Sequence, residues 1–271
     1  MAPTGWLDRV LTASGPGTTF HAVGIGSMLP RSLSGPSGAL AISQLEAFDL
    51  QGWDDVRPQS LDALRTLYTG LDHPLAVQAT LALDAVDTAR DVVNTASARP
   101  ESYSDGGFGS ALFEVARLIK SDVGVRVACI DVGGWDMHTG LGTVDSGDMT
   151  NLLGEVATAL AAFASDLGDR LDTTTVATMS EFGRRIEQNG SGGTDHGHGG
   201  VALVLGADVL GGPRGQWQGL APEMRDQGDV PGTNDYRDLF GELVGVRLGV
   251  TGAALADVFP GHTVTPIGVL G

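Results

Sequence analysis

The sequence predicts an α/β protein with a mostly parallel central sheet flanked by helices. Short apolar runs such as Val125 to Val132 are typical of buried strands, and amphipathic stretches such as Asp148 to Leu167 are typical of helices. The two kinds of segment alternate along the second half of the chain, which favours parallel strands joined by helices. We expect one domain over residues 1–271, and its parts are a loop-rich stretch 1–58, a helical segment 59–121 and an α/β core 122–271.

The loop-rich stretch has Gly, Ser and Pro clusters around two short apolar runs, which predict strands at residues 20–25 and 39–42. In the helical segment, apolar residues recur every three or four positions. This spacing predicts helices over residues 60–70, with Ser60 as N-cap and Gly70 at the end, and over residues 75–89 and 110–121.

The predicted α/β core starts with the strand at residues 125–132, which ends in a glycine pair. The stretch 148–167 is the clearest helix, because its apolar residues follow helical spacing behind an Asp/Thr start. A β-branched run at 173–179 and an apolar run at 201–205 predict two further strands. Residues 236–248 predict the last helix.

The composition excludes several classes of function. The chain has 33 acidic and 16 basic residues and a net charge of −17, which disfavours binding to nucleic acid or anionic lipid. No apolar stretch reaches the roughly 18 residues of a membrane span, and the first residues show no export signal. Cys129 is the single cysteine, which excludes an intrachain disulfide and a Cys-rich zinc module.

Polar residues follow two of the predicted strands, and ligands bind beyond the carboxyl ends of strands in such sheets. Asp136 and His138 come after strand 125–132, and their spacing points both side chains to one side of an extended chain. Glu181 comes directly after strand 173–179, and Arg184 follows three residues later. An ordinary salt bridge between Glu181 and Arg184 is the structural alternative to a role in a site.

A glycine-rich loop holds Asp195, His196 and His198 just before the last predicted strand. Its connection from Glu181 is long enough to arch back over the same edge of the sheet. Carboxylates and imidazoles are ligands of divalent metals, so the sequence predicts a metal site. Its candidate ligands are Asp136, His138, Glu181, Asp195, His196 and His198. Asp131 is either a further ligand or a turn cap, and an Asp and His that merely cap one another are the alternative reading of the loop.

Arg184 is the candidate catalytic residue, because a guanidinium beside a metal suits a bidentate grip on phosphate or sulfate. Other chemistries find little support in the sequence. It has no Gly-x-Ser-x-Gly elbow, no P-loop and no His-Glu-x-x-His motif.

Three motifs in order resemble those of the bacterial domain-of-unknown-function 1501 family. They are Gly133-Gly134-Trp135-Asp136-Met137-His138, Ser180-Glu181-Phe182-Gly183-Arg184 and Gly192-Gly193-Thr194-Asp195-His196-Gly197-His198. The resemblance covers nearly the whole chain. This family resembles the alkaline phosphatase and sulfatase superfamily, which implies an alkaline-phosphatase-like core and hydrolysis of phosphate or sulfate esters at one or two divalent metals.

Carried over by position, the superfamily resemblance implies that Asp136 and His138 are metal ligands and that His196 or His198 is another. Phe182 stands where superfamily members place a histidine ligand. We therefore expect one divalent ion, of zinc, manganese or calcium, held by some of the six candidates.

Family members usually carry a further N-terminal portion behind a twin-arginine export signal, and superfamily relatives hold their nucleophile there. We expect this chain to lack that portion, and the full-length form to be periplasmic or extracellular. The predicted function is metal-dependent hydrolysis of a small anionic phosphate or sulfate ester, with an incomplete site if the nucleophile is missing. The alternative is a non-catalytic binding or structural protein that retains the fold.

Overall fold

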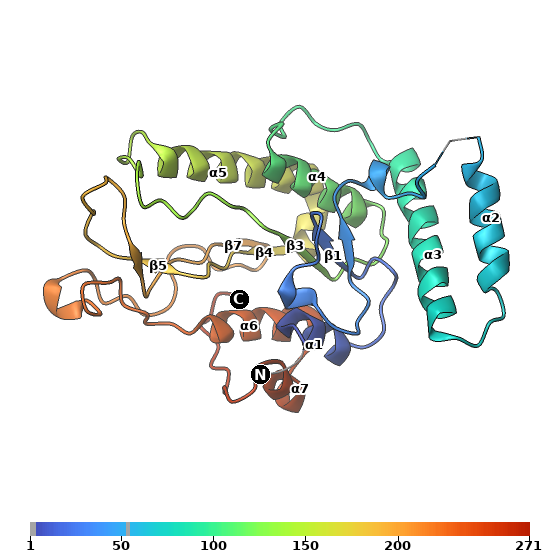
Figure 1. Ribbon diagram of the computed structural model, residues 1–271. Helices are drawn as coiled ribbons and strands as arrows, with labels where there is room; N and C mark the ends of the chain where they lie inside the picture. The colour runs from blue at the N-terminus through green and yellow to red at the C-terminus, as the bar shows by residue number, and fades with distance from the viewer. Residues whose placement is uncertain (1–3, 53–54) are drawn as a thin grey trace. The chain divides into compact units, whose positions relative to one another are not determined.

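Strand β1 (Ala22–Ile25) lies between β2 (Leu40–Ile42) and β3 (Val127–Ile130) in a three-stranded parallel sheet (Figure 1). All three strands were predicted, and each is shorter in the structure than the predicted range. Parallel neighbours cannot be joined by a tight turn, so each connection between them needs a long crossover. The crossover from β2 to β3 contains three helices, as the sequence pattern predicted.

The computed structural model describes residues 4–52 and 55–271. Residues 1–3 and 53–54 of the predicted loop-rich stretch lie outside the described residues. The chain divides into two units, Met1–Asp131 and Val132–Gly271. Strand β3 belongs to the first unit, because it pairs with β1.

The sheet of the first unit is covered on its two faces by different helices. Successive strand residues point to opposite faces, and Ala22 packs in a cluster with α1 (Trp6–Ala13). Val23 packs in the other cluster, to which α3 (Pro74–Thr95) and α4 (Gly107–Lys120) contribute. This arrangement confirms the α/β class for the first unit.

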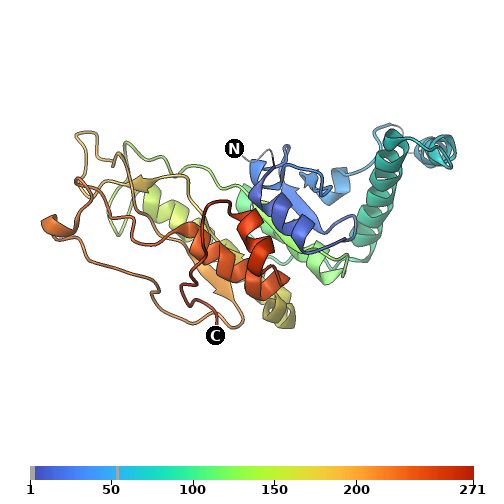
Figure 2. The same ribbon diagram turned by 90° about the horizontal axis from the view of Figure 1, so that it is seen from below.

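Helix α1 was not predicted, although Leu7, Val10 and Leu11 bury a stripe at helical spacing. Helix α2 (Arg57–Tyr68) forms an antiparallel hairpin with α3, and the two lie side by side in both views (Figures 1 and 2). The prediction of Ser60 as N-cap is wrong. Proline in the first turn starts this helix earlier, and the Ser60 hydroxyl donates to the Val56 carbonyl at 2.9 Å.

Helices α5 (Asp148–Leu167) and α6 (Tyr236–Leu248) of the second unit begin and end where the sequence predicted. The ends of α6 have local causes. The Asp235 carboxylate accepts a hydrogen bond from the Arg237 N–H at its start, and Gly249 adopts a left-handed conformation at its end. A further helix, α7 (Gly252–Val258), was not predicted.

The strands of the second unit are antiparallel, which corrects the expectation of a mostly parallel sheet. Strand β4 (Thr175–Ala177) pairs with β7 (Val204–Gly206), and β5 (Gly183–Arg184) pairs with β6 (His196–Gly197). No helix lies between β4 and β7 in the described chain. Without a helical crossover the chain returns in the opposite direction. The protein is therefore mixed α/β, and its described residues form a small parallel sheet and two small antiparallel sheets.

Short 3₁₀ turns complete the described elements, at Arg31–Leu33, Leu45–Ala47, Gly168–Thr173 and Pro222–Met224. Within residues 4–52 and 55–271, none of the helices has both the length and the apolar character that crossing a bilayer requires. This agrees with the predicted lack of a membrane span.

Candidate metal centre

The short β5–β6 hairpin sets the position of two predicted site residues. Arg184 and His196 are directly opposite in its register, and opposite residues of an antiparallel pair extend from the same face. Gly197 allows the strands to lie close, because a Cβ there would be 2.5 Å from the Arg184 carbonyl carbon. The hairpin therefore brings a guanidinium and an imidazole together across twelve residues of sequence.

Asp136 and His138 extend from one side of their segment, as their spacing predicted. Met137 between them is buried, with 6% of its surface exposed, whereas Asp136 and His138 extend to the solvent. The backbone is turned here and not extended, because the Met137 N–H donates to the Trp135 carbonyl and the His138 N–H to the Asp136 carbonyl. The His138 Nε2 atom lies 3.0 Å from the Asp136 Oδ1 atom. This pair forms half of the candidate centre.

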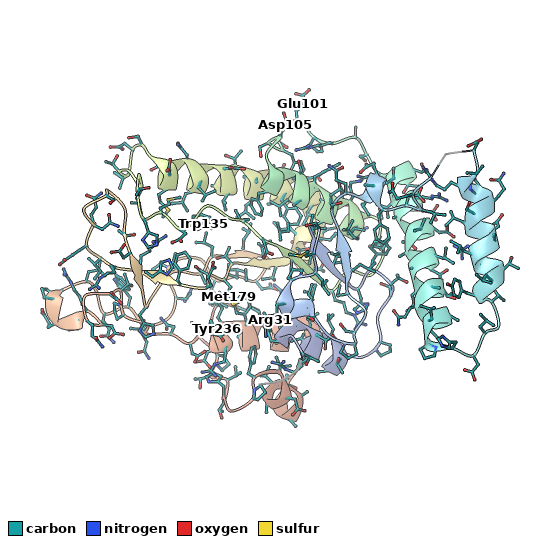
Figure 3. The ribbon with its side chains drawn as sticks, viewed as in Figure 1. Arg31, Glu101, Asp105, Trp135, Met179 and Tyr236 are labelled. Atoms are coloured by element: carbon teal, nitrogen blue, oxygen red, sulfur yellow. The ribbon has the colours of Figure 1, made fainter. Side chains whose placement is uncertain are left out.

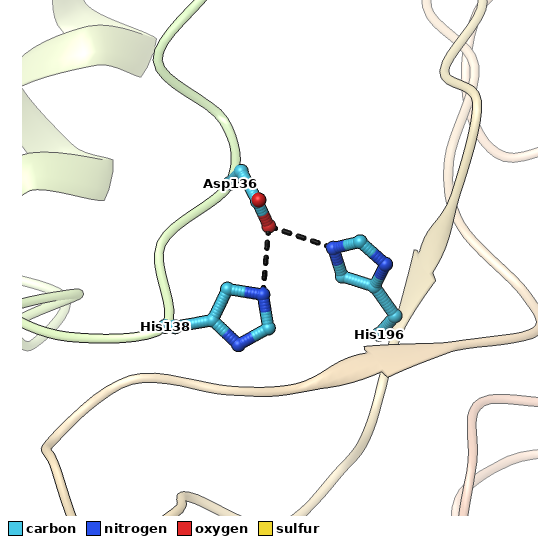
Figure 4. Close-up of side chains that lie close together, drawn as sticks. All are labelled: Asp136, His138 and His196. Atoms are coloured by element: carbon cyan, nitrogen blue, oxygen red, sulfur yellow. Dashed lines mark hydrogen bonds and ion pairs between the residues drawn. The ribbon is translucent and has the colours of Figure 1, made fainter.

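His196 completes a group of three possible metal ligands (Figure 4). Its Nε2 atom lies 2.7 Å from the same Asp136 Oδ1 atom, and the three ligand atoms all lie within 4.8 Å of one another. The side chains of Asp136, His138 and His196 are 58%, 45% and 50% exposed. The centre is therefore open to solvent and to a small ligand.

The donor set fits a divalent transition metal. Two imidazoles and one carboxylate are ligands of catalytic zinc sites and of other sites with open positions. Ligand atoms bound about 2.0–2.1 Å from a tetrahedral ion lie about 3.3 Å apart. The observed separations of 2.7 and 3.0 Å from Asp136 Oδ1 are slightly shorter, so a shift of a few tenths of an ångström admits an ion.

Asp195 contacts His138 at Nδ1, the ring nitrogen that does not face Asp136. Its Oδ1 atom is 2.9 Å from His138 Nδ1, whereas the ring faces Asp136 through Nε2. A carboxylate in this position fixes the plane of a metal-binding imidazole and raises its basicity. The predicted ligand Asp195 thus contacts a ligand of the group and is outside the group itself.

Asn189 is a site residue that the sequence reasoning missed. Its amide nitrogen donates to Asp195 Oδ1 at 3.1 Å and to the His138 carbonyl at 2.9 Å. The only local signal is the Asn-Gly pair at 189–190, which is typical of a turn and says nothing about a site.

Gly193 lets the two loops of the centre touch. A Cβ at this position would lie 2.2 Å from the carbonyl carbon of His138, so any side chain would push the loops apart. The Thr194 N–H donates to the Met137 carbonyl at 3.1 Å, directly beside this contact. Glycine at 193 is therefore required for the approach of Asp195 to His138.

Arg184 links the two loops that carry the ligand group. Its guanidinium donates to the carbonyls of Thr194 and Trp135, and to Asp136 Oδ1 at 3.3 Å. Trp135, labelled in Figure 3, directly precedes Asp136 on its segment. The Arg184 Cζ atom also lies 4.8 Å from the centroid of Phe182. The guanidinium thus contacts one loop at two points and the other at one.

Glu181 and His198, two predicted ligands of the second unit, lie outside the ligand group. Glu181 is exposed, and its carboxylate makes no ion pair with a described residue. The Nδ1 atom of His198 lies 2.6 Å from Asp226 Oδ2, and His198 is outside the ligand group. Asp131 is exposed in the first unit.

Both carboxylates of the centre are held in the charged form. The hydrogen bond with His196 is the main reason that the pKa of Asp136 is below its ordinary value, and the charges of His138 and Arg184 act in the same direction. Hydrogen bonds with His138 and Asn189 lower the pKa of Asp195. Each of these carboxylates therefore stays charged to a lower pH than a free aspartate does.

The profile of a family described as protein of unknown function (DUF1501) matches residues 17–257. Comparisons with curated proteins and with solved structures found no match. The matched range includes the whole ligand group and its neighbours Arg184, Asn189 and Asp195.

Proposed function

Since the chain belongs to the DUF1501 family, we propose its function from the candidate centre: metal-dependent hydrolysis of a small phosphate or sulfate ester. The observation that carries the proposal is the convergence of Asp136, His138 and His196 from two segments about sixty residues apart. Their exposure leaves room for a substrate beside an ion. We propose one divalent ion, and among zinc, manganese and calcium the two imidazoles favour zinc, since calcium binds mainly oxygen ligands.

A divalent ion held there would polarise an ester oxygen and lower the pKa of a bound water. Asp136, His138 and His196 would hold it, and Asp195 would keep the His138 ring in place. Arg184 donates to both loops and so fixes the separation of Asp136 and His196. The grip of Arg184 on an anionic ester stays a prediction, and it would use the donors that these contacts leave free.

The local charge supports an order of binding. Arg184 and Arg185 offset the charges of Asp136 and Asp195, but the chain as a whole carries a net charge of −17. An anionic ester is repelled from such a surface. A divalent cation makes the centre locally positive, so we expect the ester to bind only after the metal.

We also propose that the family is related to the alkaline phosphatase and sulfatase superfamily and that residues 1–271 form a single domain. For the full-length form we propose export by a twin-arginine route to the periplasm or exterior. The alternative function is a non-catalytic protein that retains the fold. It is favoured by Phe182, which stands where the resemblance expects a ligand and instead packs against His196.

The metal and the activity are tested together on the whole chain. Purified protein is analysed for zinc, manganese and calcium, and hydrolysis of aryl phosphate and aryl sulfate is measured before and after chelation. We expect stoichiometric metal and a chelator-sensitive rate that the metal restores. A folded protein that binds no divalent metal would refute the proposal, and bound metal without turnover would favour the non-catalytic alternative.

The ligand assignment is tested by three alanine variants. His138→Ala and His196→Ala each remove a ligand, so each should lower metal affinity by about 100-fold or more, beyond the typical loss for a neighbour of a ligand. His198→Ala is the matched control, because its imidazole contacts Asp226 and should leave affinity unchanged. Equal affinities in all three variants would show that the ion, if bound, lies elsewhere.

A further inference from the structure

We propose that Asn189 is a positioning residue of this centre, acting through Asp195 on His138. The inference rests on the proposed function for its effect on metal binding, and its structural part stands on the contacts themselves. Asn189 touches neither of the atoms that Asp136 and His196 offer to an ion. Its role is to hold the Nδ1 side of His138.

The Asn189 amide uses its full hydrogen-bonding capacity. The nitrogen donates to Asp195 Oδ1 at 3.1 Å and to the His138 carbonyl at 2.9 Å. The oxygen accepts from the N–H groups of Ser191 at 2.9 Å and Gly193 at 3.1 Å. A primary amide has two donors and two acceptor sites, so its orientation is fixed from both sides. The amide oxygen thus stabilises the turn at Ser191 and Gly193, and the amide nitrogen restrains His138 and Asp195.

The donor side matters because Asp195 is exposed. Its side chain is 55% accessible, and a surface carboxylate with one partner has several rotamers open to it. Asp195 Oδ1 accepts from His138 Nδ1 and also from Asn189. The second bond restrains the carboxylate in the rotamer that meets the imidazole. It also explains why aspartate could not replace Asn189 in this role, since its carboxylate would face that of Asp195.

The effect on the ion follows from the geometry of the ring. A bond at Nδ1 turns Nε2 toward Asp136, where it lies 3.0 Å from Oδ1. Mutation of a neighbour that orients a metal ligand typically lowers metal affinity by about 10- to 100-fold. Loss of the Asn189 donor should therefore weaken metal binding although every ligand remains.

Asn189→Asp is the informative variant, because it keeps an acceptor for the Ser191 and Gly193 N–H groups and replaces the amide donors by a carboxylate oxygen that faces Asp195. Asn189→Ala removes both sides, and Gln188→Ala changes an exposed neighbour as the matched control. Titration of each metal-free variant with Zn²⁺ should show affinity lowered by about 10- to 100-fold in Asn189→Asp and unchanged in Gln188→Ala. In Asp195→Asn, adding Asn189→Asp should cause little further loss, because the two residues act in series.

A second measurement needs no metal. In chelated protein the His138 Nδ1–H proton is followed by ¹⁵N-edited NMR, with the melting temperature as a check on folding. We expect slow exchange with solvent in wild type and Gln188→Ala, and fast exchange in both Asn189 variants. If the wild-type protein binds no metal, the proposed function fails. The exchange rate of the His138 Nδ1–H proton then still tests the positioning role of Asn189. Wild-type exchange in folded Asn189→Asp, or additive losses with Asp195→Asn, would overturn the inference.

Discussion

Phe182 lies parallel to His196, with the ring centroids 4.2 Å apart and an angle of 6° between the planes. The stack covers one face of the imidazole and leaves its Nε2 atom toward Asp136. A side chain found where the resemblance expects a metal ligand therefore packs against a candidate ligand and restrains its ring. The two functions need different atoms, since stacking needs a ring face and coordination needs a nitrogen.

The stack predicts a small and specific effect of Phe182→Leu. Leucine keeps an apolar side chain but loses the planar face, and aromatic pairs contribute about 0.5–1.5 kcal/mol beyond burial. We expect metal affinity to fall by about two- to tenfold, measured by calorimetric titration. Phe182→Tyr retains the ring and should bind as wild type. Equal losses in both variants would mean that the stack is not the cause.

Arg184→Lys should lower metal affinity by about 10- to 100-fold although all three ligand residues are retained. Arginine reaches the Trp135 and Thr194 carbonyls with a planar fork, and the single ammonium of lysine cannot bridge both. Metal titration of the variant gives the loss, and Arg185→Lys provides the neighbouring control. Unchanged affinity in Arg184→Lys would show that the loops hold their separation without the bridge.

Two glycines of one loop should respond differently to alanine. A Cβ at Gly193 would lie 2.2 Å from the His138 carbonyl carbon, whereas one at Gly190 meets nothing within 4 Å. Gly193→Ala should therefore separate the loops and weaken metal binding, and Gly190→Ala should not. Metal titration compares the two, with circular dichroism as a check on folding. The same affinity in both variants would contradict the close approach.

The stabilising contribution of Asp235 to the second unit should be lost in acid. The hydrogen bond from the Arg237 side chain lowers the pKa of Asp235 to about 2, against about 3.9 in an unfolded chain. A lowered folded pKa stabilises the fold fully above about pH 4, and this contribution is lost as the pH falls toward about 2. Asp235→Asn should thus unfold more easily than wild type at pH 7, by about 0.5–1 kcal/mol.

The difference between wild type and Asp235→Asn should be the same in urea titrations at pH 7 and pH 5 and smaller at pH 3, because only the last pH lies between the folded and unfolded pKa values of Asp235. Asparagine can still accept from the Arg237 N–H, so the variant tests charge rather than capping. A difference that is constant with pH would assign the effect to packing.

Cys129 should resist alkylation in the folded protein. Burial raises the pKa of its thiol to about 11, so at pH 8 its thiolate fraction is about 100-fold below that of a free cysteine. Mass spectrometry should detect slow reaction with iodoacetamide in native protein and fast reaction in urea. Fast native labelling would show that the end of β3 opens readily.

The sequence predicted the elements whose causes are local. Helices α5 and α6 begin and end where expected, because helical spacing and flanking residues set them. The β5–β6 hairpin was missed, since two-residue strands have no periodicity to detect. The predicted parallel direction of β7 was wrong for another reason. The direction of a strand depends on the connection that leads to it, and the residues within the strand do not determine this connection.

The sequence by itself determined which residues could bind a metal, because carboxylates, imidazoles and thiolates are the usual side-chain ligands and the chain has a single cysteine. It named Asp136, His138 and His196 in a larger set and could not separate them from Asp195, His198 and Glu181. Only the tertiary structure decided this. Membership of the centre depends on which ring nitrogen faces which oxygen, and His138 faces Asp136 through one nitrogen and Asp195 through the other. Contacts between residues far apart in sequence set that orientation, so no local pattern could contain it.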